Sequence, residues 1–130
     1  MTRDTPLKPD AAAIWRWLLA GYWLALCVAT HLPPTVAGLP DQRTDKLVHA
    51  SVYAGLAWLL AMAWDRSTGK LHGRHLRIAW LALVLFAAAD ELTQPWFGRT
   101  ASIGDWLADA VGTAIGVLAF RAWQRRAEPK

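Results

Sequence analysis

Polar and charged side chains crowd the stretch from Asp90 to Asp109, DELTQPWFGRTASIGDWLAD, which separates two apolar segments. Residues four apart share one face of a helix, so Asp90 is expected beside Gln94 and Asp105 beside Asp109. A charge this close to an apolar segment is costly, and its presence favours a functional site. The candidate side chains are four carboxylates, one amide and one guanidinium: Asp90, Glu91, Asp105, Asp109, Gln94 and Arg99.

A histidine in the preceding apolar segment adds acid–base chemistry. Asp45, His49 and Tyr53 are spaced i, i+4 and i+8, which places them on one stripe of a helix. His49 can act as a general base or nucleophile when a carboxylate orients its ring. Asp90 and Glu91 are consecutive and diverge by about 100°, so one should face the site while the other pairs with Arg99 or a helix end. The candidate catalytic residues are His49, Glu91 and Asp90, with Asp109 as a further carboxylate able to orient the ring.

Arg99 and Gln94 indicate what such a site could bind. The guanidinium fork matches the oxygens of phosphate or carboxylate, although an arginine that contacts lipid headgroups fits equally well. Gln94 both donates and accepts hydrogen bonds, which suits a water, a phosphate or a sugar hydroxyl. A purely structural set of ion pairs joining helix ends is the alternative. The candidate ligand-binding residues are Asp45, Lys46, Tyr53, Gln94, Arg99, Asp105 and Asp109.

Cofactor signatures are not evident in the sequence, and no nucleophile elbow, zinc motif or phosphate loop names a reaction. Several carboxylates near one histidine would nevertheless suit a divalent cation. The carboxylates available for that cation are Asp90, Glu91, Asp105 and Asp109. His72 and His75 are also close in sequence, but a solvated basic loop is the better interpretation of their surroundings.

Length and composition indicate which elements position these residues. The chain has 130 residues, enough for a single domain over 1–130, and it is 55% hydrophobic against 18% charged, unusually apolar for a soluble protein. Segments of about 20 apolar residues can cross a bilayer, where hydrogen bonding requires helices. We predict an all-α membrane protein with four transmembrane helices in a small bundle, over residues 11–31, 45–64, 76–94 and 103–123. A cleavable signal peptide is the alternative for the first segment, and acidic residues ahead of it argue against that.

Basic residues are divided unevenly between the two sides of this predicted bundle. Only Arg43, Lys46 and Arg99 fall on one side, and the positive-inside rule therefore predicts that both termini are cytoplasmic. Because the charges lie at the ends of apolar segments, the net charge of +4 does not indicate nucleic-acid binding. The predicted cytoplasmic side carries Arg3, Lys8, Arg16, Arg66, Lys70, Arg74, Arg77, Arg121, Arg125, Arg126 and Lys130.

Acidic residues show the opposite distribution, and the predicted inner half of the bundle is apolar. Gly112 and Gly116 form a GxxxG pattern, which favours close approach of a neighbouring helix. That helix can belong to the same chain or to a second copy, so an oligomer through this face is one expectation. Close packing there would bring Asp109 against a partner such as His49. Most carboxylates fall at the predicted outer end, where His31 could join them: Asp41, Asp45, Asp90, Glu91, Asp105 and Asp109.

Three motifs resemble the VanZ-like family of small membrane proteins: DKLVHASVY (45–53), DELTQ (90–94) and GRTASIGDWLADAVGTAIG (98–116). The resemblance covers residues 45–116 and implies a multi-pass protein of the bacterial cytoplasmic membrane, in a family whose founding member is linked to teicoplanin resistance. Asp109 stands where the family commonly has Asn, which adds a carboxylate to the site. The motif residues carried over are Asp45, Lys46, His49, Tyr53, Asp90, Glu91, Gln94, Arg99, Asp105 and Gly112.

Three functions remain open from the sequence. The first is binding or modification of an envelope lipid or glycolipid headgroup at the outer leaflet, with an effect on glycopeptide susceptibility. The second is a membrane-embedded hydrolase or transferase that uses His49 with a carboxylate. The third is a structural membrane subunit. An ion or proton carrier is disfavoured, because a relay needs polar groups on both sides of the midplane.

Overall fold

The computed structural model describes residues 10–32, 42–69 and 71–127, and all regular structure in these ranges is helical. The elements are α1 (Ala11–His31), α3 (Gln42–Thr68), α4 (Gly73–Thr93), the short 3-10 helix η1 (Gln94–Phe97) and α5 (Ile103–Arg126). The all-α prediction is therefore confirmed. The predicted bounds of the first helix are also correct, whereas α3 extends beyond 45–64 in both directions.

Local sequence signals explain where the helices begin and end. The Asp10 side chain accepts a hydrogen bond from the Ala12 amide and caps α1. Ser102 caps α5 in the same way, through the amide of Asp105. Pro95 lies in the first turn of η1, and Gly98 ends it with a φ of 75°, a left-handed conformation that favours glycine. This tight connection turns the chain from α4 into α5.

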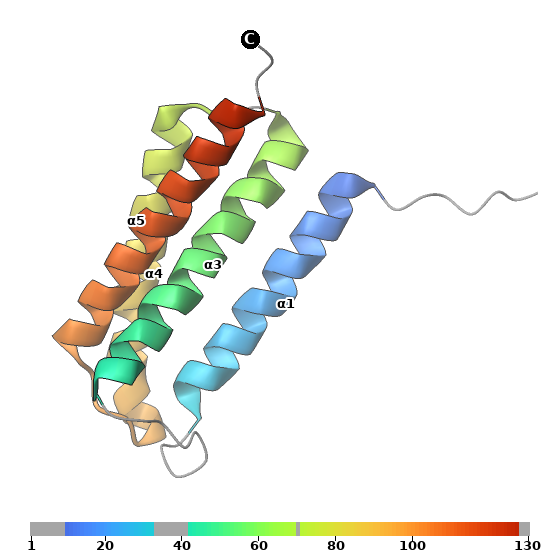
Figure 1. The fold of residues 1–130 in the computed structure, drawn as a ribbon. Coiled ribbons are helices and arrows are strands. Elements are labelled where there is room, and N and C mark those ends of the chain that lie inside the picture. The colour runs from blue at the N-terminus through green and yellow to red at the C-terminus, as the bar shows by residue number, and fades with distance from the viewer. Residues whose placement is uncertain (1–9, 33–41, 70, 128–130) are drawn as a thin grey trace, which may run out of the picture.

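The four long helices lie side by side, with α3 between α1 and α5 and with α4 packed mainly on α5 (Figure 1). One end of the bundle, here called the polar end, is where α1 and α4 finish and α3 and α5 begin. The other half, here called the apolar half, contains a core that includes Leu56, Ala57, Ala61 and Phe120. The fold thus brings the charged sequence motifs to a single end.

Glycine residues set the spacing between α3 and α5, which make the most extensive helix contact of the bundle. A Cβ atom on Gly112 would overlap the carbonyl group of Ala50, and one on Gly116 would overlap that of Ala54. The close approach predicted from the GxxxG pattern is therefore confirmed, and it lies within the chain. The neighbour on this face is α3 of the same chain, and an oligomer contact through Gly112 and Gly116 stays a prediction.

Three of the four long helices are long and apolar enough to cross a membrane: Ala11–His31, Thr44–Thr68 and Ile103–Arg126. The fourth, α4, is less clearly apolar, because Arg74 and Arg77 lie near its start and Asp90 near its end. The predicted orientation depends partly on residues outside the described ranges, including those of the N-terminal arm and the loop at 33–41. The charged residues concerned include Arg3, Lys8, Asp41, Lys70 and Lys130.

Candidate functional site

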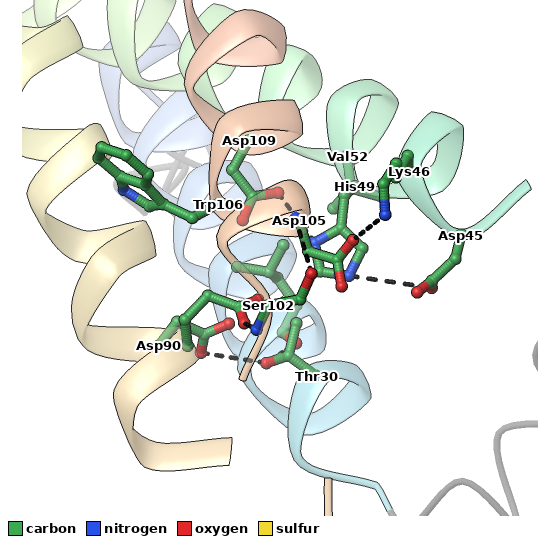
Figure 2. Close-up of polar contacts among 12 residues, drawn as sticks. Thr30, Asp45, Lys46, His49, Val52, Asp90, Ser102, Asp105, Trp106 and Asp109 are labelled. Atoms are coloured by element: carbon green, nitrogen blue, oxygen red, sulfur yellow. Dashed lines mark hydrogen bonds and ion pairs between the residues drawn. The ribbon is translucent and has the colours of Figure 1, made fainter. Parts of the chain in front are cut away.

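The centre of the polar end is a buried pair between His49 of α3 and Asp109 of α5. Their side chains point toward one another, with the Nδ1 atom of His49 2.9 Å from the Oδ1 atom of Asp109 (Figure 2). Only 7% of His49 and 1% of Asp109 is exposed. Gly112 lies one turn along from Asp109, so the close packing of α3 and α5 brings the two groups within reach. The expectation that Asp109 would meet a partner such as His49 is confirmed.

Two further charged contacts lie next to the His49–Asp109 pair, one at the other nitrogen of the His49 ring and one between Lys46 and Asp105. The Nε2 atom of His49 is 3.9 Å from the Oδ1 atom of Asp45. The Lys46 ammonium donates a hydrogen bond of 3.1 Å to Asp105, so that these groups line the start of α3 and α5 (Figure 2). His49 is therefore placed between two carboxylates, while Lys46 neutralises a third.

Glu91 is buried close to the His49–Asp109 pair and is held by two donors. Its Oε1 atom accepts a 2.9 Å hydrogen bond from the Gln94 side chain, and its Oε2 atom accepts one of 2.8 Å from the backbone amide of Ser102. The sequence predicted that one of these two acids would pair with Arg99 or with a helix end. Glu91 is the one that binds a helix end, through the Ser102 amide at the start of α5. Neither it nor Asp90 pairs with Arg99 in the described part of the chain.

Asp90 faces α1 and makes no hydrogen bond to His49. Thr30 donates to its Oδ1 atom at 3.1 Å (Figure 2). The Nδ1 atom of His31 lies 3.7 Å from the same oxygen. The His31 ring also contacts the Cys27 carbonyl and the Thr93 hydroxyl, at 2.8 and 2.9 Å. His31 therefore joins the polar end, as the sequence suggested, but through Asp90 rather than through His49.

Two adjoining hollows open around these pairs, and Arg99 lines both. A cavity of about 100 Å³ lies between α1 and α3, with His49, Tyr53 and Thr30 in its wall. A wider groove of about 590 Å³ runs along the connection 98–102 and includes Asp45, Lys46 and Asp105. Within the described residues the Arg99 guanidinium makes no hydrogen bond or ion pair. Among the side chains that the structure describes at this end, Arg99 is a cation available to meet a ligand.

Some buried polar atoms of the polar end lack a hydrogen-bond partner among the described residues: Asp45 Oδ1, Tyr53 Oη and Asp109 Oδ2. A buried polar atom without a partner costs about 1–3 kcal/mol. All three atoms belong to residues that the sequence singled out. Such atoms call for an explanation, and a bound water, an ion or a role in catalysis can each supply one.

Two contributors were missed by the sequence analysis, Thr30 and Ser102. Thr30 ends the first apolar segment directly before His31, and Ser102 precedes Asp105 with the spacing of a helix cap, so local signals existed for both. His72 and His75 lie at the opposite end, where the ring of His75 packs 5.5 Å from that of Trp64 and its Nδ1 atom accepts from the His72 amide. They cap α4 and take no part in the site.

The arrangement defines a class: a small helical protein with membrane-type helices and a buried charged cluster at one end. The family model VanZ/LLP1 matches residues 11–124, and the chain belongs to this family. The match includes α1, which lies outside the motifs that carried the resemblance. Comparison with curated proteins found no match, and comparison with solved structures found none either.

Proposed function

We propose that the polar end binds the phosphate-bearing headgroup of an envelope lipid or glycolipid. The observation that carries the proposal is the Arg99 guanidinium, which has no hydrogen-bond or ion-pair partner among the described residues and lines both the groove and the cavity beside His49. Arginine binds phosphate through two parallel hydrogen bonds, and such charge-assisted bonds are roughly twice as strong as neutral ones. A free arginine next to an open groove is therefore suited to receive an anion.

The other charged residues of the groove limit which headgroups it can accept. Lys46 and Arg99 are balanced there by Asp45 and Asp105, so the lining carries no net charge. A headgroup with several phosphates would be repelled by the two carboxylates. One phosphate together with hydroxyl or amine groups fits better, because carboxylates accept hydrogen bonds from such groups.

The headgroup proposal includes a membrane orientation. It assumes that all four helices cross the bacterial cytoplasmic membrane, with both termini inside and the polar end at the outer leaflet. The bias of Lys and Arg supports this orientation. The exposed side chains of α4 between Arg77 and Asp90 include Ile78, Leu81 and Leu85, which suits contact with lipid.

A reporter enzyme that works only in the periplasm tests that orientation. Fused after Lys130, it is expected to be inactive, while a reporter that works in the cytoplasm is active at the same position. An active periplasmic reporter with an inactive cytoplasmic one would place the C-terminus outside and reverse the orientation.

A second function, hydrolysis or group transfer, is favoured by the His49–Asp109 pair. A carboxylate 2.9 Å from Nδ1 fixes the ring so that Nε2 can take a proton from a water or hydroxyl. His49→Gln should then abolish turnover of the bound lipid while leaving its binding intact. If a variant with Gln at position 49 turns the lipid over at the wild-type rate, this function is wrong.

Lipids that copurify with the protein test the headgroup proposal most simply. Mass spectrometry should find one phosphate-bearing lipid enriched over its share of the membrane extract, and Arg99→Ala should remove the enrichment. Copurified lipids that match the bulk membrane in both proteins would overturn the proposal. Teicoplanin susceptibility, measured beside membrane abundance, then shows whether the bound lipid matters in the cell.

A further inference from the structure

Three side chains from three different helices meet behind the His49–Asp109 pair. One ring nitrogen of His49, one oxygen of Glu91 and one oxygen of Asp109 all lie within 4.8 Å of one another. The residues are 7%, 5% and 1% exposed. Two ligands on adjacent positions around one ion at about 2.0–2.2 Å are separated by about 3 Å, and the His49–Asp109 distance of 2.9 Å already has that value.

Within the described residues, no lysine or arginine forms an ion pair with Glu91 or Asp109. Even a protonated His49 would leave Glu91 and Asp109 with one negative charge in excess, and Lys46 is already paired with Asp105. Buried charges are strongly unfavourable unless they are paired or coordinate a metal. Asp109 also has its Oδ2 atom buried without a hydrogen-bond partner among the described residues. A divalent cation would supply both the missing charge and the missing contact.

Neighbouring groups form hydrogen bonds or ion pairs with His49 and Glu91, as the residues around the ligands of a metal site usually do. His49, Glu91 and Asp109 are here called the first trio. Glu91 is fixed by the Gln94 amide and by the Ser102 backbone N–H. If the Nδ1 atom of His49 binds an ion, its Nε2–H points toward Asp45, whose Oδ1 atom is 3.9 Å away and buried without a hydrogen bond among the described residues. In that state Nε2 carries a proton and does not act as the general base considered above. Histidine ligands commonly donate their other ring N–H to a carboxylate in this manner.

We propose that His49, Glu91 and Asp109 form a binding site for one divalent cation. One imidazole nitrogen with two carboxylates combines the donors preferred by Zn²⁺ and by Mn²⁺, so a first-row transition metal is the expected class. The buried Tyr53 hydroxyl, one turn from His49 on α3 and without a hydrogen-bond partner among the described residues, is available to donate to a ligand carboxylate. The cation occupies a position on the inner side of the headgroup groove.

A second trio, Asp45, His49 and Asp105, is the alternative location. It is less suitable, because Asp105 is already neutralised by Lys46 and because Asp45 is more exposed than any member of the first trio. The proposal is also independent of headgroup binding, since Arg99 and Lys46 are not ligands in either trio. Arg99→Ala should accordingly leave cation affinity unchanged.

Electron paramagnetic resonance of bound Mn²⁺ tests the proposal directly. The protein is purified without a histidine tag, stripped with a chelator and titrated with Mn²⁺, and Zn²⁺ is then added as a competitor. We expect one ion per chain with a nitrogen coupling that changes when the protein is made with ¹⁵N-histidine. Saturable binding without such a coupling, or no saturable binding of either metal, would overturn the proposal.

Isosteric variants then identify the ligands. Asp109→Asn and Glu91→Gln should each weaken Mn²⁺ binding by more than about 100-fold, beyond the roughly 10–100-fold typical of outer contacts, while Asp45→Asn should weaken it by about 10-fold. Asp105→Asn is the matched control and should leave the affinity unchanged. A large loss in Asp105→Asn with none in Asp109→Asn would assign the ion to the other trio and refute this one. Circular dichroism verifies that each variant compared is folded.

Discussion

The two ends of the α3–α5 contact use the same pair of helices in opposite ways. At the polar end the facing groups are charged, with His49 against Asp109 and Lys46 against Asp105. One to two turns further along, Ala54 faces Gly116, and beyond them lie the apolar side chains around Phe120. The difference indicates a division of tasks: close apolar packing fixes the spacing of the helices, and the charged end uses that spacing.

This comparison also explains how the charges can be buried at all. Helices that approach at glycine carry their neighbouring side chains into contact, so the pair is made one turn from Gly112. Every charge placed there costs free energy, and the apolar half must supply the stability that offsets it. Substitutions in the two regions should therefore have different consequences.

The largest loss of stability is expected from Gly112→Ala, which disrupts the close packing of α3 against α5. Its Cβ atom would overlap the Ala50 carbonyl, so α3 and α5 must move apart. We expect the free energy of unfolding to fall by about 3 kcal/mol, measured by denaturant titration in detergent micelles. Gly21→Ala is the matched control, because nothing lies within 4 Å of its Cβ position, and it should be neutral or slightly stabilising. Equal losses in the two variants would refute the role assigned to close packing.

A smaller effect is expected from the buried pair of the polar end. His49→Ala and Asp109→Ala each leave a polar partner buried and unpaired, at a cost of about 1–3 kcal/mol. The double variant should cost less than the sum of the two, with a coupling of about 1–3 kcal/mol. The same denaturant titration measures all three variants, and strictly additive costs would show that the two residues do not interact.

The smallest effect on stability is expected at Lys46, whose side chain is 45% exposed. Lys46→Met removes its ion pair with Asp105 but keeps most of its apolar stem. Exposed ion pairs contribute about 0–1 kcal/mol, so the melting temperature in detergent should change little. A loss of stability as large as that of His49→Ala would show that the Lys46–Asp105 pair stabilises the fold as much as the His49–Asp109 pair does.

The sequence was sufficient to predict the helical bundle and the residues of its polar end. The bounds of the first helix and the i, i+4 spacing of Asp45 and His49 follow from local sequence, and these predictions hold. The contacts between side chains of different helices could not be predicted, because they depend on which helices pack together. The pairing of Thr30 with Asp90 and of Ser102 with Glu91 joins residues far apart in sequence. Likewise the GxxxG pattern does not say which helix it meets, and the packing shows that α3 of the same chain lies against it.

The central claim is that the polar end is a binding site in which Arg99, without a partner among the described residues, receives the ligand. Binding of a phosphate-bearing lipid to the purified protein, titrated in nanodiscs, tests it most directly when Arg99→Ala is compared with Arg121→Ala. Arg121 is an exposed arginine near the end of α5, at the opposite end of the bundle. We expect Arg99→Ala to weaken binding by about 10- to 100-fold, the loss of hydrogen bonds to a charged group, with unchanged stability, and Arg121→Ala to have no effect. Equal weakening by both substitutions, or by neither, would contradict the account.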